Sequence, residues 1–250
     1  MIFRQLFEPD SSTYTYLLGD TESGHAVLID PVVETAERNL AVINELDLEL
    51  AYTLETHIHA DHLTGALKLK HLAGSRIAGP AEDRLRCTDV GLEEGKPFIV
   101  GSLTLHPLYT PGHTSTHHSY LLEQGDTRRV FTGDALLIDG CGRTDFQSGD
   151  AEALYRSIHD KLFTLPDDTL VYPGHDYQHK HVSTIGQEKE GNARLGGGKT
   201  LEEFVAVMNA LDLAYPAKID YAVPGNEQCG ECPPNVPLEM RKLCDVTRQG

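Results

Sequence analysis

The sequence predicts a mixed α+β / α/β fold, a four-layer αββα sandwich in which two mixed sheets pack together with helices outside. Two observations favour this class. Runs of short strands are interrupted by single helices along the whole chain, which fits sheets covered by helices. Histidine and aspartate residues also follow several of these strands directly, which places polar side chains at the rim of a sheet.

A pair of strands is expected near the start of the chain. Residues 13–18 alternate around tyrosine and leucine, and residues 24–30 form a mostly apolar run that ends in Asp-Pro. Glycine, aspartate and serine lie between the two runs, so the pair is predicted to be a hairpin. Further strands are expected at residues 50–55, 98–100, 103–109, 119–123, 130–132 and 169–171.

Helical spacing of apolar residues separates these strands. Within residues 35–46, Leu40, Ile43 and Leu46 fall on one stripe with charged residues opposite. Other helices are expected at residues 63–69, 151–162 and 201–211. Because no change in composition marks a linker, residues 1–250 are expected to form a single domain, with an irregular segment over residues 215–250.

The chain is acidic, with 21 lysine and arginine residues against 38 aspartate and glutamate residues and a formal charge of −17. General nucleic-acid binding and binding to anionic membranes both need basic surface, so neither is expected. No apolar run approaches the roughly 18 residues of a membrane-spanning helix. The first residues also lack the apolar core of a signal peptide, and we therefore expect a cytoplasmic protein.

The five cysteines do not indicate a disulfide scaffold in a chain of this length, and their odd number leaves at least one thiol without an internal partner. Cys229 and Cys232 form a CxxC pair, which supplies half of a structural zinc site. Two thiols in a Gly/Pro-rich loop are the favoured interpretation, with a redox or metal role as the alternative. Cys141 lies between two glycines, so we expect a small residue in a turn and assign it no nucleophilic role.

Four side chains that can bind a metal lie within six residues at the end of one predicted strand. They are His57, His59, Asp61 and His62. A turn at this place lets imidazoles and a carboxylate converge on one point, as a metal ion requires. A polar turn with surface histidines is the plain alternative, but the HxHxDH spacing is far more specific than that.

Three further strands are followed by the same residue types. His113 lies on a Thr-Pro-Gly-His-Thr turn, Asp134 follows the strand at residues 130–132, and His175 follows the strand at residues 169–171. Strand ends of one sheet share a rim, so the sequence predicts a metal centre there.

The motifs THIHADH, TPGHT, TGDALL and YPGHD follow one another over residues 56–176. In this the sequence resembles the metallo-β-lactamase superfamily, which implies the αββα fold. The run CGRTDFQ at residues 141–147 and the HDY at residues 175–177 resemble the persulfide dioxygenase (sulfur dioxygenase) family, which is related to glyoxalase II.

The resemblance implies a persulfide dioxygenase with one Fe(2+) per chain, bound by His57, His113 and Asp134. This two-His-one-carboxylate set is typical of non-haem iron oxygenases. The side chains that would then orient ligands or waters by hydrogen bonds, rather than bind the iron, are His59, Asp61, His62 and His175.

Two alternatives stay open. In a glyoxalase II-type thioester hydrolase acting on S-lactoylglutathione, the same histidines and aspartates would hold two Zn(2+) ions. In the other alternative, the chain is a non-catalytic metal- or thiol-binding protein of the same fold.

The implied substrates are glutathione persulfide, O2 and water, and the implied products are sulfite and glutathione. Arg143, Arg194 and Tyr177 are the candidates for binding this substrate. A guanidinium can hold a carboxylate of glutathione through two hydrogen bonds, and the Tyr177 hydroxyl could donate a hydrogen bond to the substrate or to O2. For Arg143 the competing role is to brace its own loop. We also expect a homodimer and, as a possible partner, a separate rhodanese-like sulfurtransferase.

Overall fold

The computed structural model describes residues 1–245. Contacts group the chain into two compact units: one contains residues 1–92, 99–103 and the chain from residue 215, and the other contains residues 93–98 and 104–214. That the units form one domain stays a prediction from the sequence. No helix of the described part is long and apolar enough to cross a membrane.

The first unit contains a six-stranded mixed sheet. Its strands lie in the order β1 (Ile2–Glu8), β2 (Thr13–Asp20), β3 (His25–Ile29), β4 (Glu49–Leu54), β5 (Arg76–Pro80) and β6 (Val90–Leu92). Pairing is antiparallel from β1 to β3 and parallel from β3 to β6. The carboxyl ends of β3 and β4 therefore meet at the same edge of the sheet.

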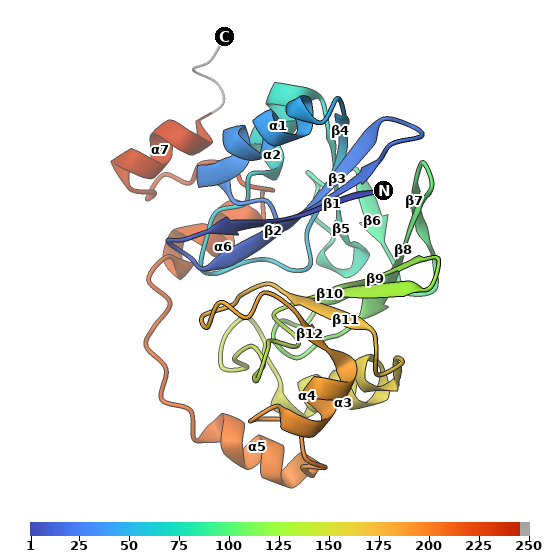
Figure 1. Cartoon of the computed structure of the whole chain (residues 1–250). Helices are drawn as coiled ribbons and strands as arrows, with labels where there is room; N and C mark the ends of the chain where they lie inside the picture. Colours follow the sequence, from blue (N-terminus) through green and yellow to red (C-terminus); the bar gives the residue numbers. More distant parts are fainter. Residues whose placement is uncertain (246–250) are drawn as a thin grey trace. The chain divides into compact units, whose positions relative to one another are not determined.

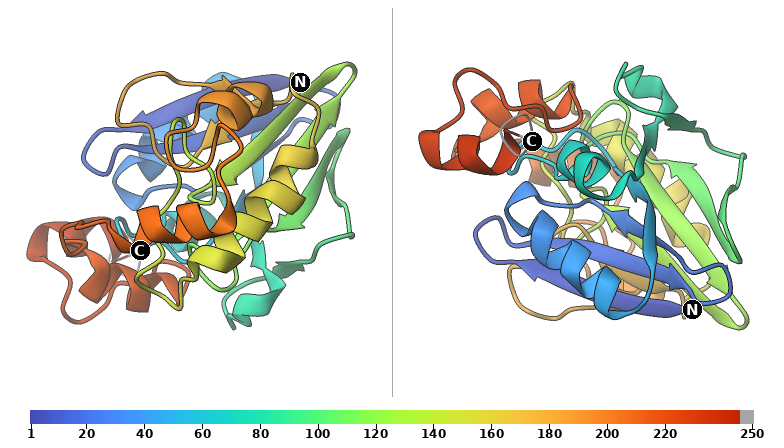
Figure 2. Two further views of the ribbon diagram at one scale, coloured as in Figure 1. Left: turned by 90° about the horizontal axis from the view of Figure 1, so that it is seen from below. Right: turned by 90° about the horizontal axis from the view of Figure 1, so that it is seen from above.

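Two helices cover a face of this sheet (Figure 1). They are α1 (Ala36–Glu45) and α2 (Ala66–Ala73). Ile43 of α1 and Leu69 of α2 are fully buried in one cluster with Leu17 and Leu28 of the strands. The right-hand view of Figure 2 shows α1, in blue, lying across these strands. The predicted hairpin and the first two predicted helices are confirmed, each within four residues of its expected ends.

The second sheet lies almost entirely in the second unit. Its strands follow the order β12 (Ser183–Thr184), β11 (Leu170–Pro173), β10 (Thr127–Gly133), β9 (His118–Gln124), β8 (Leu103–Tyr109) and β7 (Phe98–Val100). β8, β9 and β10 pair antiparallel, whereas β10 and β11 pair parallel. The carboxyl ends of β10 and β11 therefore lie at the same edge of this sheet.

Three helices pack on this second sheet. They are α3 (Ala151–Asp160), α4 (Ile185–Gly191) and α5 (Leu201–Asn209). Leu154 and Ile158 of α3 and Phe204 of α5 form one buried core with Val130 and Val171 of the strands. Short 3-10 turns complete the fold of the described chain at η1 (Val33–Thr35), η2 (Ala81–Asp83) and η3 (Leu162–Thr164).

The segment after residue 215 differs from the expectation that it is irregular. It contains α6 (Ile219–Asn226) and α7 (Leu238–Cys244). Met240 and Cys244 of α7 pack with Val33 and Leu63, so tertiary contacts stabilise helices that show little apolar periodicity.

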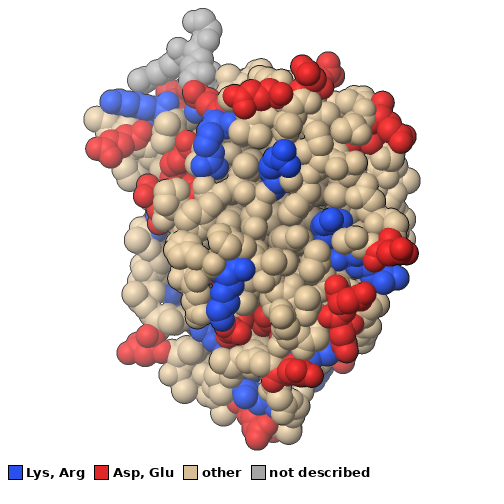
Figure 3. Space-filling view, in the orientation of Figure 1, with Lys and Arg blue, Asp and Glu red and all other residues tan. Residues whose placement is uncertain are grey.

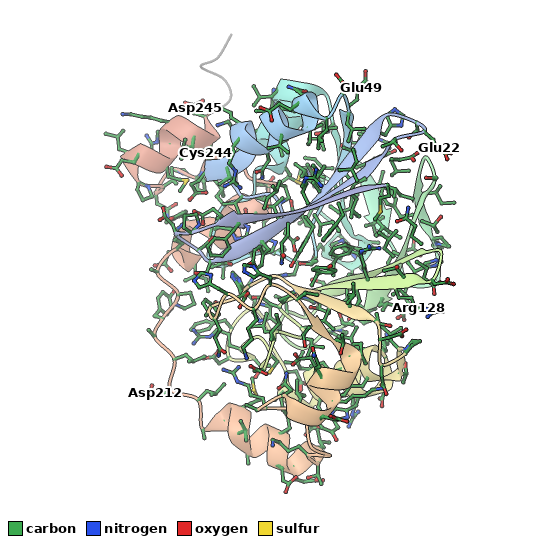
Figure 4. All side chains as sticks on the ribbon, in the orientation of Figure 1. Glu22, Glu49, Arg128, Asp212, Cys244 and Asp245 are labelled. Carbon is green, nitrogen blue, oxygen red and sulfur yellow. A yellow bond between two sulfur atoms is a disulfide. The ribbon has the colours of Figure 1, made fainter. Side chains whose placement is uncertain are left out.

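Both cysteines of the CxxC pair are oxidised, which corrects the expectation of two thiols. Cys229 is bonded to Cys87, which lies 142 residues away in sequence, and Cys232 is bonded to Cys244 on α7 (Figure 4). Pairing over such a distance has no local signal in a sequence. Cys141 is the one free cysteine of the described residues, as the odd count requires.

Charged side chains of both signs are interspersed on the face shown in Figure 3. On the surface, ion pairs such as Arg128 with Glu123 and Lys96 with Glu93 join charges of opposite sign. The face in Figure 3 carries no extended basic patch.

Helix α3 offers a test of the local sequence signals. Asp150 caps the helix, because its carboxylate accepts a hydrogen bond of 3.0 Å from the backbone N–H of Ala153. Asp150→Ala should lower the free energy of unfolding by about 0.5–2 kcal/mol in urea titrations. Asp126→Ala, in the exposed turn between β9 and β10, is the control and should change it by less than about 0.5 kcal/mol. Equal effects of the two substitutions would show that the cap contributes nothing.

Candidate metal centre

The HxHxDH motif forms the loop that joins β4 to α2 in the first unit. His57, His59 and His62 are all buried there, although histidines on a surface turn would be exposed. The sequence placed this motif directly after a strand, and the structure has it there. The ring centroid of His59 lies 4.1 Å from that of His57 and 4.3 Å from that of His62, so the three imidazoles lie close together in this loop.

Asp30, at the end of β3, organises the start of this loop. Its carboxylate accepts hydrogen bonds from the backbone N–H of Thr56, at 2.7 Å, and from the Thr56 hydroxyl, at 2.8 Å. Since that hydroxyl donates to Asp30, it accepts from Nδ1–H of His57, 2.9 Å away. The lone pair of His57 is thereby assigned to Nε2, the tautomer that a metal ligand needs.

His59 faces two carboxylates with its other nitrogen. Nε2 of His59 lies 3.2 Å from Asp30 and 3.4 Å from Glu55. Burial by itself lowers the pKa of His59, but the two carboxylates outweigh it and raise that pKa well above the usual value. Burial raises the pKa of Glu55. With Nε2 engaged in this way, Nδ1 is the atom of neutral His59 that can bind a metal.

Asp61 and His62 complete the cluster of polar side chains in this loop. Nδ1 of His62 lies 3.0 Å from the Asp61 carboxylate, which also accepts a hydrogen bond from the Thr13 hydroxyl. This contact leaves the lone pair of His62 on Nε2. His59, Asp61 and His62 each bring a ligand atom within 4.8 Å of the others, which is close enough for one ion to bind all three.

The second unit holds the other predicted side chains at one edge of its sheet. His113 lies in the loop between β8 and β9, Asp134 follows β10, and His175 follows β11. Nε2 of His113 and Nε2 of His175 each lie 3.5 Å from Oδ2 of Asp134. The parallel pairing of β10 and β11 produces this proximity of Asp134 and His175.

Backbone groups orient the side chains of this cluster. Nδ1–H of His113 donates to the carbonyl oxygen of Arg143 at 2.7 Å, which leaves the lone pair on Nε2. Nε2 of His117 accepts from the backbone N–H of Asp134 at 3.2 Å, and His117 in turn contacts the Thr110 hydroxyl. His117 is therefore a positioning group for Asp134 that the sequence motifs did not reveal.

Two glycines give this cluster its room. A Cβ at Gly142 would lie 2.8 Å from Nδ1 of His113, and a Cβ at Gly174 would lie 2.6 Å from Oδ1 of Asp134. Both distances are far below normal contact, so any side chain at these positions would displace His113 or Asp134.

Each unit offers donor atoms that suit a metal ion. Nδ1 of His59, Nε2 of His62 and Oδ1 of Asp134 are buried and make no hydrogen bond with the residues described, 1–245. Buried polar atoms of this kind are costly unless a ligand satisfies them. Imidazole nitrogens and carboxylate oxygens are the donors that iron and zinc take in proteins.

Arg143 makes the contacts that its bracing role requires. Its guanidinium forms a bidentate pair with Asp145, at 2.6 and 2.7 Å, and donates to the carbonyl of Ala214 at 2.8 Å. The hydrogen bonds from Arg143 hold the pKa of Asp145 below its usual value. Arg194 donates to the carbonyl of Cys141, on the same loop, at 2.6 Å. Substrate binding by these arginines stays a prediction.

Cys141 and Tyr177 lie in opposite environments. Burial raises the pKa of the Cys141 thiol to about 11, so at neutral pH it is not a thiolate nucleophile. The Tyr177 side chain is 68% exposed, and its ring stacks on the ring of His175 with centroids 5.6 Å apart. Tyr177 is thus in contact with His175, a candidate metal-binding residue of its unit.

Sequence reasoning missed four residues whose hydrogen bonds reach the candidate metal-binding residues of their own unit, or the loop that carries them: Asp30, Thr56, His117 and Asn226. Asp30 alone had a signal, because it follows a strand as the predicted ligands do. The other three are recognisable only by their hydrogen bonds.

Replacing Arg143 tests its bracing contacts. A lysine keeps the charge but loses the bidentate geometry, so Arg143→Lys should lower stability by about 1–2 kcal/mol. It should also weaken iron retention, because the Arg143 carbonyl orients His113. Arg156→Lys, in an exposed pair on α3, is the control. A raised KM for glutathione persulfide with unchanged melting temperature and iron content would instead assign Arg143 to substrate binding.

Comparisons with known proteins identify the family and the fold. Residues 9–175 match the metallo-beta-lactamase superfamily. The mitochondrial persulfide dioxygenase ETHE1 of Bos taurus is 48% identical over 242 residues, which cover 94% of this chain and 91% of that protein. A hydroxyacylglutathione hydrolase of Methylococcus capsulatus is 37% identical and covers 73% of this chain and 69% of its own.

Among solved structures, ETHE1 from Myxococcus xanthus matches with a TM-score of 0.88 and 51% identity, over 92% of this chain and all of that one. The predicted fold class is thereby confirmed. The chain belongs to the metallo-beta-lactamase superfamily and, within it, to the persulfide dioxygenase family.

Proposed function

We propose that this protein is an iron-dependent persulfide dioxygenase that acts on glutathione persulfide. In the overall reaction, glutathione persulfide, O2 and water yield glutathione and sulfite. The observation that carries the proposal is the identity of 48% to persulfide dioxygenases over nearly the whole chain. The weaker and shorter similarity to hydroxyacylglutathione hydrolase makes thioester hydrolysis the less supported activity.

His57, His113 and Asp134 would hold the iron. The two histidines have Nδ1 engaged by Thr56 and by the Arg143 carbonyl, so each offers Nε2. When bound, ferrous iron supplies a centre at which O2 and a persulfide sulfur can be brought together.

The remaining polar side chains have orienting roles in this proposal. His59 is held by Asp30 and Glu55, and His62 is held by Asp61. Such residues set the direction and basicity of the groups around a metal and of any bound water. His59, Asp61 and His62 are also the residues that would bind a second metal ion. The metal content per chain therefore distinguishes the two activities.

Glutathione persulfide carries two carboxylates, and Arg143, Arg194 and Tyr177 stay the predicted contacts for it. A homodimer, a cytoplasmic location and a separate sulfurtransferase partner likewise stay predictions.

Metal analysis tests the proposal directly. Protein purified without oxygen should contain close to one iron per chain and little zinc, measured by mass spectrometry of the elements. An oxygen electrode should record O2 uptake only when glutathione persulfide is supplied. Two zinc ions per chain together with rapid hydrolysis of S-lactoylglutathione would replace the dioxygenase with the hydrolase.

Substitutions separate the iron ligands from the orienting residues. His113→Ala or Asp134→Ala should remove bound iron, because each deletes one of three protein ligands. His62→Ala or His175→Ala should retain most of the iron, with affinity or activity reduced by about 10–100-fold. His71→Ala, on the exposed end of α2, is the control. The same loss of iron in all four variants would contradict a mononuclear site with these ligands.

A further inference from the structure

Asn226, the last residue of α6, contacts the HxHxDH loop of its own unit through its side chain. Nδ2 donates to the backbone carbonyls of His59 and His62, both at 2.8 Å. Oδ1 accepts from the backbone N–H of Thr64 at 2.9 Å. Asn226 is buried, so all three hydrogen bonds are shielded from water.

These bonds fix a part of the chain that has no ladder of its own. The loop between β4 and α2 forms neither helix nor strand, so its buried backbone groups depend on partners from elsewhere. The two N–H donors of this planar amide bind carbonyls that lie three residues apart, those of His59 and His62. Its oxygen accepts from the backbone N–H of Thr64, two residues further on. The carbonyls of His59 and His62 belong to the residues whose imidazoles gather in the loop. Because each imidazole projects from this backbone, a shift of the backbone would move the imidazoles of His59 and His62 with it.

Asn226 is itself held firmly. Its carbonyl accepts from the backbone N–H of Cys229 at 2.9 Å, and the carbonyl of Cys229 accepts from Leu67 of α2 at 3.1 Å. The disulfide from Cys229 to Cys87 ties the same turn to the segment that follows η2. The neighbouring backbone is also close, because a Cβ at Gly225 would lie 2.4 Å from the Leu63 side chain. An amide anchored in this way can impose its geometry on the loop.

We infer that Asn226 is a positioning residue that holds the metal-binding loop in its ligating geometry before any metal is bound. It touches no reacting atom and acts through the backbone of His59 and His62. The inference rests on the proposed function only in naming iron as the metal, since the hydrogen bonds exist in the polypeptide alone.

The sharpest test is Asn226→Asp, which keeps the size of the side chain but removes both N–H donors and sets a carboxylate against two carbonyls. Asn235→Asp is the matched control, because Asn235 is exposed in the same segment and also donates to a backbone carbonyl, that of Asp220. In metal-free protein, hydrogen exchange of a peptide covering residues 57–65 should speed up at least tenfold in Asn226→Asp and stay unchanged in Asn235→Asp.

Metal binding supplies a readout that a purely structural role would not move. Affinity for Fe(2+), and for Co(2+) as a spectroscopic probe, should fall by about 10–100-fold in Asn226→Asp. The visible spectrum of the cobalt form should change as well, because the ligands are no longer aligned. Wild-type affinity and an unchanged cobalt spectrum in Asn226→Asp would overturn the inference.

The wild-type protein gives a test that does not need a variant to fold. By NMR, the amide of Thr64 in metal-free protein should be protected from exchange as well as the amides of α6 are. Exchange of Thr64 at the rate of an open loop would overturn the inference. Absence of persulfide-dependent O2 uptake by the wild-type protein would refute the proposed function alone, since exchange and metal affinity do not depend on the substrate.

Discussion

The geometry of the HxHxDH loop depends on one buried carboxylate, that of Asp30. Burying a carboxylate is costly unless hydrogen bonds satisfy it, and here Thr56 supplies two donors while His59 supplies a third contact. The same bonds determine which nitrogen of His57 carries the lone pair. Asp30 has a φ of +50°, a strained conformation for a residue other than glycine, and such strain is typical of functional sites.

In the second unit, backbone groups rather than a carboxylate orient the candidate metal-binding side chains. The carbonyl of Arg143 orients His113, and the amide of Asp134 is bound by His117. The loop that carries Arg143 has to keep its shape for this to work. Its bidentate pair with Asp145 and the hydrogen bond from Arg194 to Cys141 hold it. Arg143 and Arg194 therefore support the candidate metal-binding side chain of His113 through the backbone of this loop.

The C-terminal segment has a role in this centre that its composition concealed. Its cysteines are joined in two disulfides, and its Asn226 binds the backbone of the HxHxDH loop. A region rich in proline and cysteine lacks periodicity because its order comes from cross-links and from contacts to distant residues. This is why two short helices there were not predicted.

By itself, the sequence determined the hairpin, the principal helices and the fold class, and it singled out the candidate metal-binding residues. Alternation, helical spacing and the motifs after strands are local properties, and local patterns survive in the primary structure. Short strands such as β5 and β6, the partner of Cys229 and the positioning groups Thr56, His117 and Asn226 were decided by the tertiary structure. Each of these depends on contacts between residues far apart in sequence. A single hydrogen bond or disulfide across such a distance leaves no periodic signal for the sequence to show.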